Sequence, residues 1–134
     1  LTGGLVVASL VEVPGASAVV RGGVVAYATD IKASVLGVDA DLLSEHGAVH
    51  PEVARQMAAN VRDVLSVDVG ISTTGIAGPS SPDGQPVGTV HVGVATALGA
   101  QVFTYVFSGD RDQIRHKTVS AAIDAALVVL KSGA

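Results

Sequence analysis

Apolar positions along the chain alternate between helical and strand spacing, a pattern typical of an α/β domain in which helices cover a sheet. The clearest helical pattern spans residues 51–65, where proline stands in the first turn and apolar side chains recur on one face. Further helices are predicted over residues 5–11, about 29–36, about 39–45, and from Gly109–Asp110 to near Gly133. Strands are predicted over residues 22–27, 67–73, 88–96 and 101–107, the last two as a hairpin. We therefore expect a single three-layer α/β/α domain with a mixed sheet covered by helices.

Several residues mark the expected ends of these helices. Thr29 or Asp30 can cap the helix near residue 29, and Gly37 stands where a left-handed residue would end it. Asp110, followed three residues later by Gln113, resembles a capping box for the last helix.

The composition limits the class of protein. With 134 residues, 49% hydrophobic and 15% charged, the chain is long enough to bury one core and too apolar to be disordered. Eight Lys and Arg against twelve Asp and Glu give a net charge of −4, and there are only two tyrosines and two phenylalanines, so a nucleic-acid ligand is not expected. Without cysteine there is neither a disulfide framework nor a thiolate nucleophile. We expect a cytoplasmic protein.

The uncharged stretch from Gln85 to Gly109 is long enough to raise the question of a membrane helix. Its glutamines, proline, histidine and glycines favour two buried strands instead, so no membrane contact is expected. The chain opens without methionine on a helical pattern already under way, which predicts that a segment upstream of Leu1 is missing.

The glycine-bearing segment after the 67–73 strand is the first candidate for chemistry. Ligands of open α/β sheets collect at the carboxyl ends of strands, and the glycines at 75 and 78 let backbone N–H groups approach a ligand closely. The segment Thr74–Gly78 can therefore bind a phosphate or line an oxyanion hole. The alternative is a turn whose glycines supply only backbone freedom.

Three single residues are further candidates. Lys32 lies among apolar residues of a short helix, where desolvation would lower its pKa and make it a base; a solvated helix lysine is the alternative. Tyr27 is either a functional residue or a core aromatic. Arg111, at the start of the last helix, can meet an anion or be a surface cation.

The four histidines do not predict a metal site. His46 and His50 are four residues apart, but Gly47 and Pro51 interrupt the helix that would place them on one face. His91 falls in a predicted strand, where packing is its commoner role.

Taken together, a series of short segments resembles the CinA C-terminal domain, the nicotinamide-nucleotide amidohydrolase family, over essentially the whole chain. The segments, in the order found in that family, are Thr2–Gly4, Val13–Ser17, Gly22–Tyr27 with Lys32, Leu36–Val38, His46–Val49, Thr74–Pro79, Pro86–Val90 and Gly109–Arg111. Three positions depart from the family pattern: Leu1 replaces a cysteine, His50 replaces a capping Ser or Thr, and Ser80–Ser81 replace a glycine-rich run.

The resemblance implies an activity. Members are regarded as metal-free, cofactor-free serine amidohydrolases that convert nicotinamide mononucleotide to nicotinic acid mononucleotide and ammonia with a Ser–Lys pair. The nucleophile lies in a Glu-Ser-x-Thr-Gly-Gly motif with Leu1 at x, so the serine is expected immediately before Leu1. Lys32 falls on the general base and Tyr27 on the active-site tyrosine. The expected substrate-binding residues are Thr2, Gly3, Thr74, Gly75, Ile76, Ala77, Gly78 and Arg111.

Two other readings differ from this one. The chain can be a non-catalytic interaction module associated with competence or the DNA-damage response, or a metal-dependent nucleotide pyrophosphatase, for which it lacks ligands. A mean hydropathy of +0.53 also suggests a buried self-interface, and therefore a homo-oligomer.

Overall fold

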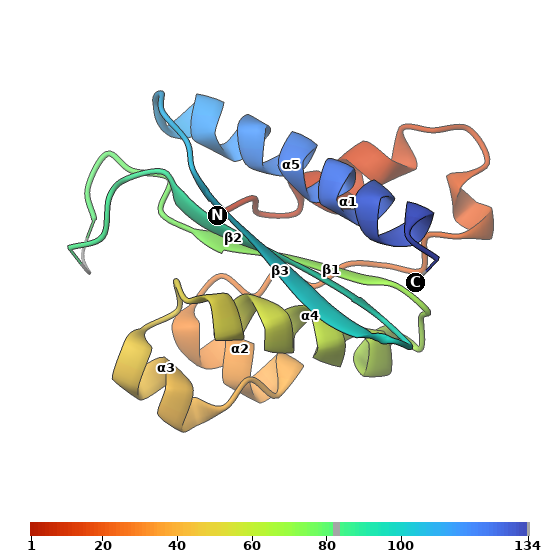
Figure 1. The fold of residues 1–134 in the computed structure, drawn as a ribbon, viewed down its shortest axis with the longest axis horizontal. Coiled ribbons are helices and arrows are strands. Elements are labelled where there is room, and N and C mark those ends of the chain that lie inside the picture. Colours follow the sequence, from red (N-terminus) through yellow and green to blue (C-terminus); the bar gives the residue numbers. More distant parts are fainter. Residues whose placement is uncertain (82–83, 134) are drawn as a thin grey trace.

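The computed structural model describes residues 1–81 and 84–133, which form a sheet between two layers of helices (Figure 1). Helices α1 and α5 lie on one face of the sheet, and α2, α3 and α4 lie on the other. The elements are α1 (Leu5–Val11), η1 (Ala16–Ala18), α2 (Thr29–Leu36), α3 (Ala40–His46), α4 (Pro51–Leu65), β1 (Gly70–Gly75), β2 (Thr89–Thr96), β3 (Gly99–Val106) and α5 (Arg111–Lys131). The predicted three-layer α/β architecture is confirmed.

The central strand β2 carries the core of the sheet. It pairs antiparallel with β1 on one side and with β3 on the other, and each of its residues is buried. Its valines pack against α5 around Ile114, whereas its opposite face lies against α4. Gly93 allows that close approach, because an added Cβ would overlap the carbonyl oxygen of Ala54 on α4.

The sheet differs from the expected one in the segment 22–27. This segment was predicted to be a buried strand, but it is irregular and pairs with none of the described strands, so the sheet in residues 1–81 and 84–133 is antiparallel rather than mixed. A strand requires a neighbour to accept and donate its ladder hydrogen bonds. A cleft, described below, lies between this segment and β1, and removes that neighbour.

Strand β1 also begins and ends later than predicted, at Gly70 and Gly75 instead of residues 67 and 73. Thr74 and Gly75 therefore belong to the strand and not to a loop after it. The hairpin prediction is confirmed, with a two-residue turn between Thr96 and Gly99. The polar loop 80–86 includes Pro82 and Asp83, which lie outside the described residues.

The helix ends follow the sequence signals with one exception. Gly37 ends α2 in the left-handed conformation, with φ of 66°, and Asp110 and Gln113 form the predicted capping box of α5. The exception is the start of α2: the N-cap is Ala28, and neither Thr29 nor Asp30 caps the helix with its side chain.

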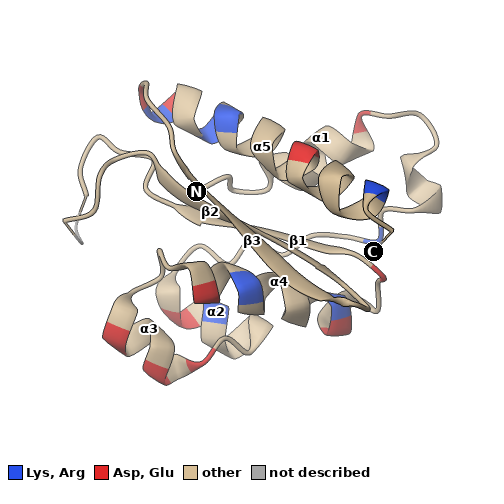
Figure 2. Ribbon diagram, viewed as in Figure 1, with Lys and Arg blue, Asp and Glu red and all other residues tan. Residues whose placement is uncertain are grey.

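Charged residues occur on both helical layers without a continuous basic stripe in the view of Figure 2. Several Asp and Glu residues lie on the α2–α3 side of the sheet. In the part of the chain that the structure describes, no helix is both long and apolar enough to cross a membrane.

His50 caps the N-terminus of α4 with its side chain. Its Nδ1 accepts a hydrogen bond from the backbone N–H of Glu52 at 3.1 Å, directly before Pro51 begins α4. We expect His50→Ala to lower the free energy of unfolding by about 1 kcal/mol, since the N–H loses its acceptor, and His50→Ser to retain most of it. Urea unfolding measures both, and equal losses in the two variants would rule out the capping role.

Candidate functional site

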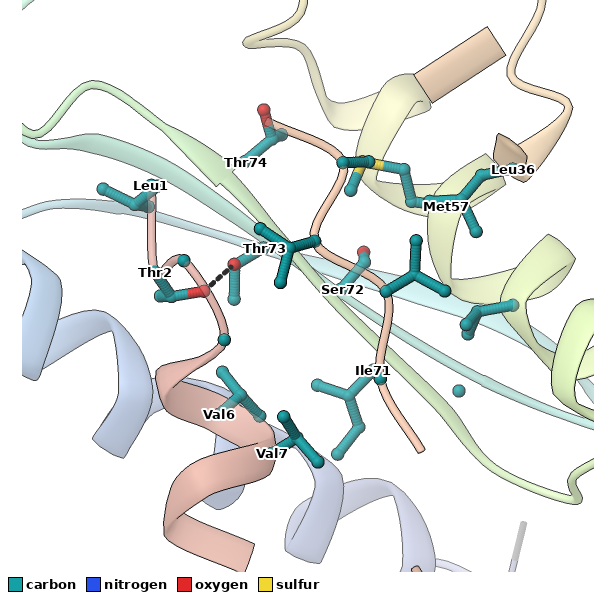
Figure 3. A pocket seen from close by; sticks show the side chains of 18 of the residues that line it. Leu1, Thr2, Val6, Val7, Leu36, Met57, Ile71, Ser72, Thr73 and Thr74 are labelled. Atoms are coloured by element: carbon teal, nitrogen blue, oxygen red, sulfur yellow. Dashed lines mark hydrogen bonds between the residues drawn. The ribbon is translucent and has the colours of Figure 1, made fainter. Parts of the chain in front are cut away.

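A cleft of about 760 Å³ runs along β1 between the two helical layers (Figure 3). Strand β1 forms one wall with the edge that does not face β2, and the segment from Val19 to Tyr27 forms the other. Helix α1 contributes Val6 and Val7 from one layer, and α2 and α4 contribute Leu36 and Met57 from the other. The cleft is therefore a mostly apolar groove, into which a few polar groups project.

Most of the residues that the sequence singled out line this cleft. They are Thr2, Gly3, Tyr27, Lys32, Thr74, Gly75, Ala77 and Arg111. Ile76 and Gly78 lie beside it: the N–H of Ile76 donates to the carbonyl of Thr89 at 2.9 Å, and the carbonyl of Gly78 accepts from Arg111 at 2.8 Å.

Lys32 is the buried cation of the site. It lies on α2, is only 7% exposed, and its Nζ donates to the carbonyl oxygen of Ala26 at 2.6 Å and to that of Tyr27 at 3.4 Å. Burial lowers the pKa of the Lys32 ammonium. Lys32 is therefore a desolvated lysine held by neutral carbonyl groups, and not a solvated lysine on a helix surface.

Tyr27 contacts Lys32 through its backbone rather than its ring. The side chain is 67% exposed, so it is no core aromatic, and the carbonyl is the group that accepts from Nζ. Tyr27 lines the cleft, so its exposed side chain can meet a bound molecule.

Two threonines of β1 fix the cleft wall to neighbouring segments. The Thr74 hydroxyl donates to the carbonyl of Ala48 at 2.8 Å, and the Thr73 hydroxyl is 2.9 Å from that of Thr2, the bond drawn in Figure 3. At Gly75 an added Cβ would come within 2.8 Å of the Leu1 side chain. The same Cβ would also come within 2.8 Å of the Thr89 carbonyl oxygen and the Val90 side chain, so this glycine makes room both for Leu1 and for strand β2.

Three cations, Lys32, Arg115 and Arg111, lie close enough to the Leu1 nitrogen to act on it electrostatically. In the range 1–81 and 84–133 none of the three forms a salt bridge with a carboxylate. This end of the cleft therefore attracts anions and disfavours a further positive charge.

Arg115 is a residue whose role the sequence left open, since either it or Arg111 could contact a substrate. Its Nε donates to the carbonyl of Leu1 at 3.0 Å and its Nη2 donates to that of Thr2 at 3.3 Å. The available signal was its spacing from Arg111, since residues four apart share one face of a helix.

Three of the histidines contact other side chains of the fold. The rings of His46 and His50 lie 4.6 Å apart, and buried His91 pairs its Nδ1 with the hydroxyl of Thr104 across the β2–β3 ladder at 2.8 Å. Burial, and secondarily His50, lower the pKa of His91. Among the described residues no group of three or more His, Cys, Asp and Glu is placed to hold a metal ion.

The arrangement combines a desolvated amine with an anion-attracting end of a largely apolar groove. A lysine whose pKa is lowered exchanges protons more readily near neutral pH than an exposed one. Cations without carboxylate partners can hold a phosphate or stabilise a developing oxyanion. Both features suit a reaction in which a proton is moved beside an anionic substrate.

Comparison with known sequences gives one family. Residues 1–130 match the model of the CinA C-terminal domain. A CinA-like protein of Frankia casuarinae is 48% identical over 124 residues, which are 92% of this chain and 29% of that protein. A CinA-like protein of Anaeromyxobacter sp. is 46% identical over 132 residues, which are 97% of this chain and 32% of that protein. The chain thus spans about three-tenths of the length of these relatives.

Solved structures agree with the sequence match. The competence/damage inducible protein CihA from Agrobacterium tumefaciens superimposes with a TM-score of 0.91 at 35% identity, covering 97% of this chain and 80% of that one. A competence-damaged protein (CinA) superfamily protein from Enterobacter cloacae gives a TM-score of 0.92 at 28% identity, covering 96% and 77%.

The burial of Lys32 predicts a pH dependence of stability. Its pKa is lower in the folded protein than the ordinary value of 10.5, so the unfolded chain holds this proton more tightly. The resulting contribution to stability is fully present above pH 10.5 and is lost as the pH falls through the lowered folded value. We expect the unfolding free energy of the wild type to rise relative to that of Lys32→Met as the pH rises towards 10.5. Denaturant titrations across this range measure it, and a pH-independent difference would contradict the desolvation.

Proposed function

We propose, from the premise that the chain belongs to the CinA C-terminal domain family, that it hydrolyses the carboxamide of nicotinamide mononucleotide. The products are nicotinic acid mononucleotide and ammonia. The observation that carries the proposal is the buried Lys32, whose Nζ lies in a cleft also lined by Leu1, before which the nucleophilic serine is expected.

In the proposed reaction Lys32 accepts and returns a proton in each of two steps. Neutral Lys32 accepts the proton of the serine hydroxyl as its oxygen attacks the amide carbon, and the resulting ammonium returns that proton to the leaving nitrogen, so that ammonia departs and an ester remains. Water then attacks the ester while Lys32 accepts its proton, and the ammonium returns that proton to the departing serine oxygen, which restores serine and neutral Lys32. The carboxylic acid that is released ionises to the carboxylate by losing one proton to solvent. A lowered pKa suits both directions of transfer, because the lysine must be able to gain and to lose the proton near neutral pH.

The charges at the cleft support an anionic substrate. Lys32 and Arg111 line the cleft, and a mononucleotide brings a phosphate of opposite charge. Arg111 is exposed, and one of its five N–H donors binds the carbonyl of Gly78. We assign phosphate binding to Arg111, and contact with the pyridine ring to the exposed ring of Tyr27.

A non-catalytic interaction module explains the cleft less well. Burying an ammonium with only carbonyl partners costs free energy of folding, and a surface used solely for docking gains nothing from that cost. Bringing three cations close together without carboxylate partners also costs free energy of folding, and docking gains nothing from that cost either. We therefore favour the enzyme.

The first test is the release of ammonia from nicotinamide mononucleotide by a protein that extends upstream of Leu1 through the expected serine. We expect release in the presence of EDTA, because the proposed mechanism uses no metal. The chain that begins at Leu1 is the matched control and should be far slower, since Thr2 is displaced along the chain from the nucleophile position. Comparable rates for the two proteins would show that the serine assignment is wrong, and activity that is lost with EDTA and restored by zinc would exclude the metal-free reaction.

The second test concerns Lys32 in the same extended protein. Lys32→Ala is expected to lower kcat by at least about 100-fold, the usual contribution of a positioned acid–base group. Lys32→Arg should not restore it, because guanidinium stays protonated and cannot accept the serine proton. Lys131→Ala, at the exposed end of α5, is the control and should keep the wild-type rate. An active Arg variant would leave Lys32 as an electrostatic group and not a base.

A further inference from the structure

We propose that Arg115 is a positioning residue: its guanidinium fixes the backbone at Leu1–Thr2 and thereby the orientation of the residue that precedes Leu1. The inference rests on the proposed function, in which that preceding residue is the nucleophile. It assigns Arg115 a role distinct from that of Arg111, one helical turn earlier on α5.

The hydrogen bonds of Arg115 define two consecutive peptide planes. Nε donates to the carbonyl of Leu1 at 3.0 Å, and Nη2 donates to the carbonyl of Thr2 at 3.3 Å. Because the guanidinium is planar and its donors have a fixed spacing, two bonds from one edge restrict the orientation of both carbonyls. A lysine ammonium, as a single point on a flexible stem, cannot impose this restriction.

The same short segment is held from the opposite side by β1. The buried Thr2 hydroxyl pairs with that of Thr73 at 2.9 Å, and the Leu1 side chain lies against Gly75. The segment is thus held between a strand of the sheet and a helix that covers it. Arg115 supplies the helix side of this clamp.

The local chain does not hold this geometry by itself. Gly3 and Gly4 both have positive φ, at 60° and 96°, and the seven-residue helix α1 that follows has no side-chain cap on its N-terminus. A helix of this length is marginal without tertiary contacts. The position of Leu1–Gly4 therefore depends on its contacts with Arg115 and Thr73.

The contacts of Arg115 also separate it from substrate binding. Two of its donors are directed at the chain's own backbone, and it is half-buried, whereas Arg111 is exposed. We therefore expect loss of Arg115 to misplace the nucleophile without weakening the binding of the mononucleotide. A displacement of about 1 Å at a reacting group is enough to cost about 100-fold in rate.

The test uses Arg115→Gln and Arg115→Lys in the extended protein, with nicotinamide mononucleotide as substrate. We expect kcat to fall about 100-fold in the Gln variant and at least about tenfold in the Lys variant, with KM within about twofold of the wild type. In Arg111→Gln, by contrast, KM should change more than kcat. The pH dependence of kcat that belongs to Lys32 should keep its midpoint in both Arg115 variants. Lys117→Gln, which removes another side-chain bond from α5 to a backbone carbonyl, is the control and should leave both parameters unchanged.

A second measurement is independent of the reaction. Hydrogen exchange of the amides of residues 2–5 should be faster in Arg115→Gln than in the wild type or Lys117→Gln, while α4 and β2 keep their protection. If the wild type releases no ammonia, the proposed function fails but this exchange still tests the clamp. The positioning role is overturned by unchanged exchange, by a rise in KM with kcat unchanged, or by both variants retaining wild-type kcat. It is also overturned if thermal unfolding shows that both variants fail to fold, because Arg115 would then support the whole domain.

Discussion

A carbonyl dipole can direct a cation without neutralising its charge, and the cleft depends on contacts of this kind. Lys32 donates to two carbonyls, Arg115 to two more and Arg111 to one. Had carboxylates held these three side chains, their positive charges would have been compensated within the protein, and the pKa of Lys32 would have been raised. Carbonyl partners leave the charge available to an anionic ligand while they still fix where it stands.

The packing of the sheet makes room for this arrangement. Gly93 lets α4 approach β2 closely, and the valines of β2 fill the space beneath α5, so the core is complete on both faces of the central strand. Strand β1 is held by β2 on one side, and its other edge borders the cleft. The packed core therefore lies directly beside the cleft, which explains how a small domain can carry buried charge.

Local sequence patterns predicted what local interactions determine. The bounds of α4 and the capping box at Asp110 were accessible, because periodicity and capping signals lie close together in the chain. For Lys32 the sequence left open whether the side chain is buried or solvated, and the structure shows it buried. The cap predicted at Thr29 or Asp30 failed locally, but the larger failures involve distant partners. The segment 22–27 has strand composition but no strand beside it, and Arg115 contacts carbonyls more than 110 residues away, which no side-chain motif encodes.

The use of backbone carbonyls as partners for the cations has an evolutionary consequence. The hydrogen bonds of Arg115 and Lys32 go to backbone carbonyls of Leu1, Ala26 and Tyr27, and not to the side chains of these residues. Substitutions at those contacted positions leave the hydrogen bonds in place as long as the main chain keeps its course. Of these three positions, the exposed Tyr27 can therefore change its side chain without losing the hydrogen bond, whereas Ala26 is buried in the core and Leu1 packs against Gly75. Selection on the geometry of the groove falls instead on the few long cations that reach across to the backbone.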